Sequence, residues 1–172
     1  MCTRGVILLF NITPNHKFFD SIRRFLLKII GFNISNNVKV FSPIHISPKT
    51  KPSNIVLKEN VFINSNVRFS APLNSKITIE KNTLIAANVC FETVNHGLLY
   101  EPNKPRGASL GDILIKEGVW VGINTTILQN VTIEEGVVVA ANSVVNKNIN
   151  KYNIVGGVPA KVIKVINERS KE

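Results

Sequence analysis

Branched aliphatic residues recur at every sixth position in the C-terminal half of the chain. The series is unbroken over six members: Ile115, Val121, Ile127, Ile133, Val139 and Val145. The positions two residues earlier are also small or branched: Ile113, Val119, Thr125, Val131, Val137 and Ser143. This spacing fits neither an α-helix, with a period of about 3.6, nor a simple strand, with a period of about 2. It is typical of a short strand followed by a corner and then repeated.

Three such units close one triangular turn of a parallel β-helix. Residues 18 positions apart then stack on one another at about 4.8 Å, as in other parallel sheets. The pattern predicts three stacked pairs: Ile115 on Ile133, Val121 on Val139, and Ile127 on Val145. Between these positions stand residues suited to sharp corners or a positive φ: Gly118, Gly122, Asn124, Asn130, Gly136, Asn142 and Asn146.

The same spacing runs through the N-terminal half, where it is broken three times. Its inward positions are Ile34, Val40, Ile46, then Leu57, Ile63, Phe69, then Ile79, Ile85, Phe91. The first break holds the proline-rich stretch 47–53, the second a short insertion, and the third the segment 97–111. We expect all three to be loops that leave the helix. Since long structureless loops are uncommon in compact domains, the segment 97–111 is expected to be functional.

An amphipathic helix is expected ahead of the repeats. Segment 15–30 carries apolar residues at helical spacing with basic residues between them, and Gly31 follows as a stop signal. Such a helix would cover the open edge of the first coil. The alternative for a basic amphipathic helix is contact with a membrane surface. The apolar run 6–10 is far shorter than the roughly 20 residues that span a bilayer.

These patterns predict an all-β fold, a single-stranded parallel β-helix with a short N-terminal helix and a protruding loop. The expected division is an N-terminal segment 1–33 with the capping helix, the β-helix 34–164 with loop 97–111, and a C-terminal tail 165–172. A terminal strand or helix is expected at 162–168. A chain of 172 residues with 44% hydrophobic content suits one domain with a continuous core.

Charge and cysteine content narrow the range of partners and compartments. The net charge of +10 favours an anionic partner, such as a phosphorylated cofactor, a nucleic acid or an acidic membrane. The basic residues are scattered, without zinc-finger spacing or a dense run, which disfavours nucleic acid. With only Cys2 and Cys90, no disulfide framework is expected, and a reducing cytoplasm suits the chain best.

Two segments carry a resemblance to a known family. Gly118-Val-Trp-Val-Gly-Ile123 and Gly156-Gly-Val-Pro-Ala-Lys-Val-Ile-Lys164 resemble the hexapeptide-repeat acetyltransferases, which include galactoside, maltose, xenobiotic and polysaccharide O-acetyltransferases. The resemblance covers roughly 34–164. It implies a left-handed winding and a homotrimer whose sites are built from two chains. It also implies acetyl-CoA as co-substrate, no metal, and a hydroxyl of a saccharide or polysaccharide precursor as acceptor.

His96 is the residue that the resemblance identifies as general base, because the family's histidine precedes the protruding loop as Asn95-His96-Gly97 does here. Imidazole titrates close enough to neutral pH to accept the proton of an attacking alcohol. The implied step is direct attack on the thioester, without an acyl-enzyme. The alternative nucleophile, Cys90, precedes the inward Phe91 and is expected to point outward. His16 and His45 are expected on the surfaces of the helix and of a coil.

Further site residues follow from the resemblance. Asn66 stands where relatives place an acceptor-binding asparagine, although a corner role explains it equally well. Trp120 is expected to line the site, with the subunit interface as the alternative. Lys147, Lys161 and Lys164 are candidates for phosphate contacts. The expected CoA groove between prisms is lined by Gly122, Ile123, Ala140, Ala141, Asn146, Lys147, Val158, Pro159 and Lys164.

Other functions of the same fold remain as alternatives. A γ-type carbonic anhydrase needs three zinc-binding histidines from adjacent coils, and the three histidines here are too widely separated along the chain. A non-catalytic assembly module would have no need for the His96 loop. Within the acetyltransferases, the acceptor could instead be an amino-sugar nitrogen or an antibiotic hydroxyl.

Overall fold

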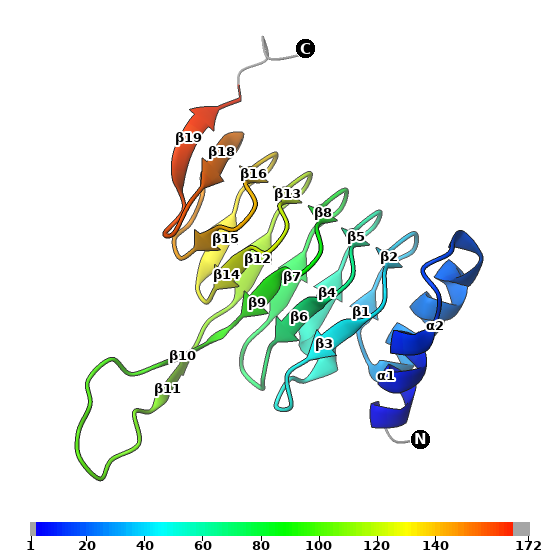
Figure 1. Ribbon diagram of the computed structural model, residues 1–172, viewed down its shortest axis with the longest axis horizontal. Helices are drawn as coiled ribbons and strands as arrows, with labels where there is room; N and C mark the ends of the chain where they lie inside the picture. The colour runs from blue at the N-terminus through cyan, green and yellow to red at the C-terminus, as the bar shows by residue number, and fades with distance from the viewer. Residues whose placement is uncertain (1–2, 167–172) are drawn as a thin grey trace.

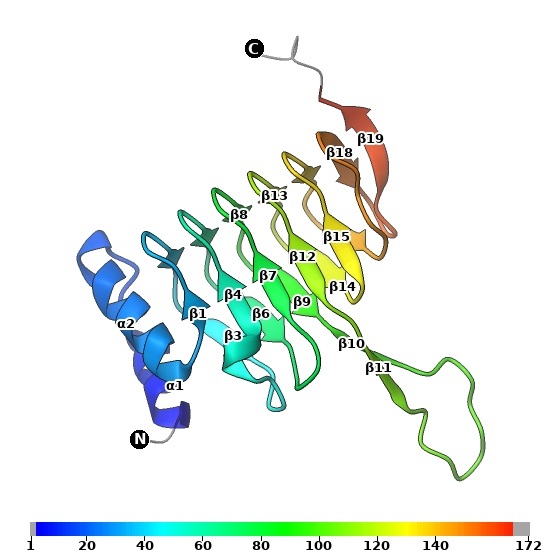
Figure 2. The same ribbon diagram turned by 180° about the vertical axis from the view of Figure 1, so that it is seen from behind.

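The chain forms a parallel β-helix with two helices at one end, in a computed structural model that describes residues 3–166 (Figure 1). The helices are α1 (Thr3–Ile12) and α2 (Asp20–Ile30), with the short 3-10 helix η1 (Lys17–Phe19) between them. The coils then stack one after another, and the view from behind shows the same regular rise (Figure 2). The predicted parallel β-helix is confirmed.

Three sheets form the sides of the helix, and from β1 to β17 their members follow one another along the chain in the order A, B, C. Sheet A contains β1 (Asn33–Ile34), β4 (Ile55–Leu57), β7 (Ile77–Ile79), β12 (Ile113–Ile115) and β15 (Val131–Ile133). Sheet B contains β2 (Lys39–Val40), β5 (Phe62–Ile63), β8 (Leu84–Ile85), β13 (Trp120–Val121), β16 (Val138–Val139), β18 (Asn153–Gly156) and β19 (Lys161–Val165). Sheet C contains β3 (Ile44–Ile46), β6 (Val67–Ser70), β9 (Cys90–Glu92), β14 (Thr126–Leu128) and β17 (Val144–Val145).

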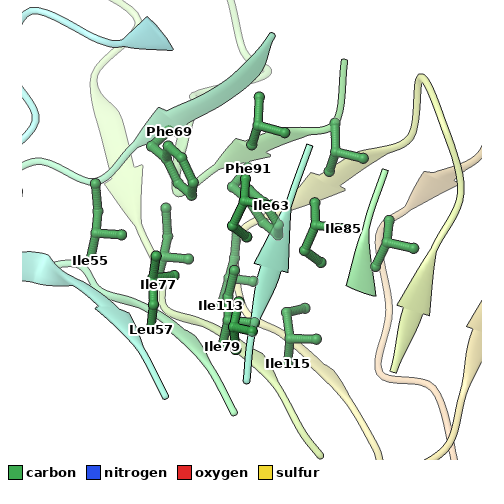
Figure 3. Close-up of a cluster of buried hydrophobic side chains, with 14 of the residues drawn as sticks. Ile55, Leu57, Ile63, Phe69, Ile77, Ile79, Ile85, Phe91, Ile113 and Ile115 are labelled. Atoms are coloured by element: carbon green, nitrogen blue, oxygen red, sulfur yellow. The ribbon is translucent and has the colours of Figure 1, made fainter. Parts of the chain in front are cut away.

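The stacking predicted from the sixfold period is confirmed pair by pair. Ile115 lies on Ile133 in sheet A, Val121 on Val139 in sheet B, and Ile127 on Val145 in sheet C. None of these six side chains is more than 1% exposed. The column continues through the N-terminal coils, where the rings of Phe69 and Phe91 stack at 5.5 Å (Figure 3). Burial of this column supplies the main stabilisation of the fold.

Asparagines with positive φ turn the corners of the coils. Asn66, Asn88, Asn124 and Asn142 occupy the corner between sheets B and C, with φ between 57° and 60°. The side chains of the last three form a ladder in which Asn88 donates to Asn124 and Asn124 donates to Asn142. Asparagine tolerates this conformation because its short polar side chain bonds locally. Of the predicted corner residues, Gly118, Asn130 and Gly136 also have positive φ, whereas Gly122 and Asn146 do not.

The N-terminal segment contains one more helix than the sequence pattern indicated. The apolar run 6–10 belongs to α1, and its buried Val6 and Phe10 join the same core as Leu27 of α2. Asn11 attaches α1 to the first coil by exchanging hydrogen bonds with the backbone of Ile44. No helix within residues 3–166 is both long and apolar enough to cross a membrane.

The three breaks in the period all fall at the corner between sheets C and A. The chain leaves this corner after β3, where the short helix η2 (Pro52–Asn54) leads back, after β6, and after β9. The longest excursion is a hairpin of β10 (Val94–His96) and β11 (Ala108–Leu110), which are antiparallel. The expected loop 97–111 therefore includes a strand, and the excursion starts before His96 rather than after it. Insertions that share one corner lie next to one another on successive coils.

The C-terminal end of the helix also carries an antiparallel strand. β19 pairs with β18 at the edge of sheet B and is exposed along its whole length. It accounts for the expected terminal element up to Val165, and residues 167 and 168 of that expectation lie outside the described part of the chain.

Truncation of one inward side chain should destabilise the whole column. Ile127 is fully buried between Phe91 and Val145, so Ile127→Ala should lower the free energy of unfolding by about 2–5 kcal/mol. The neighbouring Thr126 faces outward on the same strand, and Thr126→Ala should change it by less than about 0.5 kcal/mol. Chemical denaturation would measure both, and equal losses would contradict the inward assignment.

Candidate active site

A groove of about 700 Å³ lies along the corner at which the period breaks. One wall is the hairpin of β10 and β11, the other is the loop that follows β3, and the floor is the outer face of sheet C. All three insertions contribute to it. Its lining residues are Ser47, Pro48, Lys49, Thr50, Arg68, Ser70, Pro72, Glu92, Val94, His96, Ala108 and Leu110.

His96 lies in the wall of this groove, at the end of β10, with an exposed side chain. Its Nδ1 is 3.0 Å from the backbone carbonyl oxygen of Gly107, on the facing side of the hairpin. A carbonyl can only accept a hydrogen bond, so this contact places the imidazole proton on Nδ1. The Nε2 lone pair is then free to accept a proton from a molecule in the groove.

Local contacts fix the hairpin that carries His96. At its base the buried Thr93 hydroxyl donates to the carbonyl of Ser70 at 2.7 Å and lies 2.8 Å from the hydroxyl of Ser75. Beyond His96, the Gly97 amide donates to the carbonyl of Arg106 at 3.1 Å. A Cβ atom at position 97 would lie 2.2 Å from that carbonyl oxygen, so the close approach requires glycine. The histidine therefore projects from a backbone anchored to the coils.

Cys90 lies on the outer face of β9, in register with Arg68 of β6, and is half-buried as the outward assignment predicts. Burial raises the pKa of its thiol above the ordinary value, and the nearby Glu92 carboxylate raises it further. The Arg68 guanidinium opposes this rise in pKa but has the smallest effect of the three. Since the thiolate is the nucleophile, a raised pKa disfavours Cys90 as an acyl acceptor.

Asn66 and Trp120 do not line the groove. Asn66 turns the corner between sheets B and C with a φ of 60°, and its backbone N–H donates to the backbone carbonyl of Pro43. Trp120 is 53% exposed on the outer face of sheet B, beside Leu84 and Val138. Within one chain, these two residues thus lie on other parts of the surface than His96.

The residues expected to bind CoA lie on the coils nearer the C-terminus, from β13 to β19, and none of them lines the groove. Ile123 and Ala141 follow β13 and β16 at the corner between sheets B and C, and the carbonyl of Ile123 accepts from the amide of Asn142. Val158 and Pro159 lie in the exposed turn between β18 and β19, which also contains Gly157, whose carbonyl accepts from the Val144 amide. The lysines 147, 161 and 164 are exposed. Gly122, Ile123, Ala140 and Ala141 precede the sheet C strands β14 and β17, whereas His96 lies beyond the end of the sheet C strand β9. Asn146 and Lys147 follow β17 and therefore lie at the corner between sheets C and A, on a coil nearer the C-terminus than the groove.

The histidines of the described residues do not come together. His16 caps η1, where its Nδ1 accepts from the Phe18 amide, and His45 is exposed on β3. Over residues 3–166, three or more His, Cys, Asp or Glu side chains nowhere gather in a way that could hold a metal ion.

Comparison with known proteins identifies the family. Residues 112–147 match the sequence profile described as bacterial transferase hexapeptide (six repeats). The chain is 31% identical to galactoside O-acetyltransferase of Escherichia coli (strain K12) over 98% of its length and 80% of that protein. It belongs to the hexapeptide-repeat acetyltransferases. A second relative of the same organism, named as a lipopolysaccharide biosynthesis O-acetyltransferase (WbbJ), is 36% identical over 68% of this chain and 63% of its own length.

Solved structures of hexapeptide-repeat acetyltransferases agree with this assignment. A galactoside acetyltransferase in complex with coenzyme A superposes with a TM-score of 0.85 at 30% identity, covering 98% of this chain and 81% of that one. A Vibrio cholerae member in complex with acetyl-CoA gives 0.83 at 30% identity, covering 96% and 86%. The predicted family, enzyme class and co-substrate are thereby confirmed: the protein is an acetyl-CoA-dependent acetyltransferase.

Three charged side chains that line the groove were not predicted from the sequence as site residues: Lys49, Arg68 and Glu92. Arg68 and Glu92 are outward residues of coils and Lys49 belongs to a loop, so that none of the three is distinguishable by pattern from solvated surface. The available signal was their position, since all three lie within a few residues of a break in the sixfold period.

Proposed function

We propose that this hexapeptide-repeat acetyltransferase transfers an acetyl group to a saccharide hydroxyl, with His96 as general base. The observation that carries the proposal is the contact between His96 Nδ1 and the carbonyl of Gly107, which leaves Nε2 as an acceptor in the wall of the groove. The chemistry of a base and a thioester requires no further protein nucleophile.

The reaction follows from this arrangement. The acceptor hydroxyl loses its proton to Nε2 as its oxygen attacks the thioester carbonyl carbon. The tetrahedral intermediate then collapses, the carbon–sulfur bond breaks, and the thiolate takes the proton from the imidazolium. The products are an acetyl ester and CoA with a free thiol, and the imidazole returns to its starting state.

The saccharide acceptor is supported by the named activities of the relatives, which act on galactosides or belong to lipopolysaccharide biosynthesis. A polysaccharide precursor is the acceptor that we favour. Transfer to an amino-sugar nitrogen or an antibiotic hydroxyl is the alternative that an acceptor panel would reveal, and binding of CoA without turnover would indicate an assembly module. The left-handed winding implied by the family resemblance stays a prediction.

Replacement of His96 should abolish most of the turnover without unfolding the enzyme. We expect His96→Ala to lower kcat by about 10²–10⁴-fold, the range typical of general bases, while binding of CoA is retained. Thiol release from acetyl-CoA would measure kcat, and calorimetry would measure binding. His45→Ala, which removes an exposed histidine of β3, is the matched control and should be close to wild type. Full turnover by the His96 variant would refute the assignment.

We further propose that the enzyme is a homotrimer. Two apolar surfaces of the single chain support this: the tip of the hairpin exposes Leu98, Leu99 and Tyr100, and sheet B exposes Leu84 and Trp120. The separation of His96 from the expected CoA residues supports it too, because a neighbouring chain would bring the two sets together. Large exposed apolar patches are characteristic of subunit interfaces.

Wild-type protein should have a mass in solution of three times the 19.0 kDa chain. Trp120→Glu should reduce the mass in solution to that of a single chain at micromolar concentration, because an unpaired carboxylate would be buried in the interface. Light scattering after gel filtration would measure both masses. Leu73→Ser, which alters an exposed leucine outside the two surfaces, should leave the trimer intact. A monomeric wild type would overturn the proposal.

The N-terminal helices are proposed to contact the cytoplasmic face of a membrane as well as to cap the first coil. They expose the apolar side chains of Leu8, Ile12, Phe18, Phe25 and Ile29, and they also carry the cations Arg4, Lys17, Arg24 and Lys28. Exposed apolar side chains together with cations suit a surface of anionic lipid. The helices stand at the end of the β-helix remote from β19 (Figure 1).

Sedimentation with lipid vesicles would test this contact. We expect the protein to bind vesicles that contain phosphatidylglycerol and not vesicles of phosphatidylcholine alone, with the bound fraction falling several-fold in high salt. The double variant Phe18→Ser/Phe25→Ser should lose binding, and Ile163→Ser, on β19, should retain it. Equal binding by both variants would show that the helices are not responsible.

A further inference from the structure

We infer that the acceptor carries an anionic group, a carboxylate or a phosphate, and that Arg68 and Lys49 recognise it. This inference rests on the proposed function, since it concerns the saccharide whose hydroxyl meets His96. The inference goes beyond the proposed function by naming the chemical group that distinguishes this acceptor from a neutral sugar.

Arg68 and Lys49 line the same groove as His96 but approach from different elements. Arg68 stands on the outer face of β6, opposite Cys90 of β9, and thus on the floor. Lys49 belongs to the loop after β3, which forms the wall facing the hairpin. A molecule that presents a hydroxyl to His96 would therefore have a cation beneath it and another across from it.

Both cations lack an ion-pair partner among residues 3–166. The ion pairs of that part of the chain are Arg23 with Asp20, Lys81 with Glu117, Lys104 with Glu101, and Lys116 with Glu134. Two unpaired cations in one concave site, Arg68 in the floor and Lys49 in a wall, create a positive potential, because low-dielectric walls focus the field.

Glu92 is the one carboxylate in the lining of the groove, and it does not neutralise this potential. One of its oxygens accepts from the Val94 amide at 3.3 Å, and no ion pair joins it to Arg68 or Lys49. With His96 uncharged, the lining residues carry two positive charges against one negative. The guanidinium of Arg68 suits either anion, since it binds carboxylates and phosphates through two parallel hydrogen bonds.

Matched acceptors would test the inference. Methyl hexosides, hexuronates and hexose 1-phosphates share several hydroxyls and differ in the presence and kind of anion. We expect kcat/KM of the wild type to be at least about tenfold higher for an anionic member than for its neutral partner, and which anion is preferred will identify the group. A charge-assisted hydrogen bond is worth about 1.5–3 kcal/mol, so Arg68→Gln should reduce kcat/KM for the anionic acceptor by roughly 10–150-fold.

The pattern among variants separates recognition from a general structural effect. Arg68→Gln should act mainly through KM of the anionic acceptor and change the neutral one less than about twofold, with Arg68→Lys intermediate because it keeps the charge. Lys49→Gln should act in the same direction. Glu92→Gln should act oppositely and lower KM for the anion. Lys58→Gln removes an exposed cation outside the groove and should match the wild type.

Two results would overturn the inference. One is equal use of neutral and anionic acceptors by the wild type, and the other is an Arg68→Gln effect on KM for acetyl-CoA alone, which would assign the arginine to the CoA phosphates. If no acceptor is turned over, calorimetry with His96→Ala decides: binding of hexose 1-phosphate or hexuronate that Arg68→Gln abolishes supports anion recognition even though the proposed transfer has failed. Absence of such binding refutes it.

Discussion

The structure depends on the in-register stacking of inward aliphatic side chains, one layer for each turn of the coil. A single coil buries almost nothing, because each of its short strands has only one or two inward residues. Once neighbouring coils stack, Ile115 covers Ile133 and is covered by Ile79, and water is excluded from the whole column. Backbone hydrogen bonds between coils can form only in the same register, so packing and hydrogen bonding stabilise one alignment.

The same constraint determines where chemistry can be placed. Inward positions are occupied by the column, and regular corners are occupied by asparagines whose backbone bends sharply. Insertions are therefore tolerated at corners, and here three of them share the corner between sheets C and A. His96 owes its position to this arrangement: the hairpin projects from the coil, while Thr93 and Gly97 hold its backbone to the adjacent chain segments.

The column could be predicted residue by residue because β-branched inward residues repeat without exception from Ile115 to Val145. The helix α1 was missed because the run 6–10 is short and apolar on all sides, and its burial depends on α2 rather than on its own pattern. The pairing of β10 with β11 was missed because loop residues such as Ala108 show no strand period. His96 was identified only through the family resemblance, and the charges around it required three dimensions, since Lys49 and Arg68 are 19 residues apart in the sequence.

Because the three insertions share one corner, the loops that line the groove can change without a change in the stability of the stacked column. The spacing of inward residues is counted along the strands, so lengthening a corner loop leaves every stacked pair of the column intact. The loops that form the walls of the groove can thus be exchanged, shortened or extended without disturbing the stability of the prism. In such a scaffold the shape of those walls can diverge, while the strands that carry Arg68 and Glu92 in the floor keep their register.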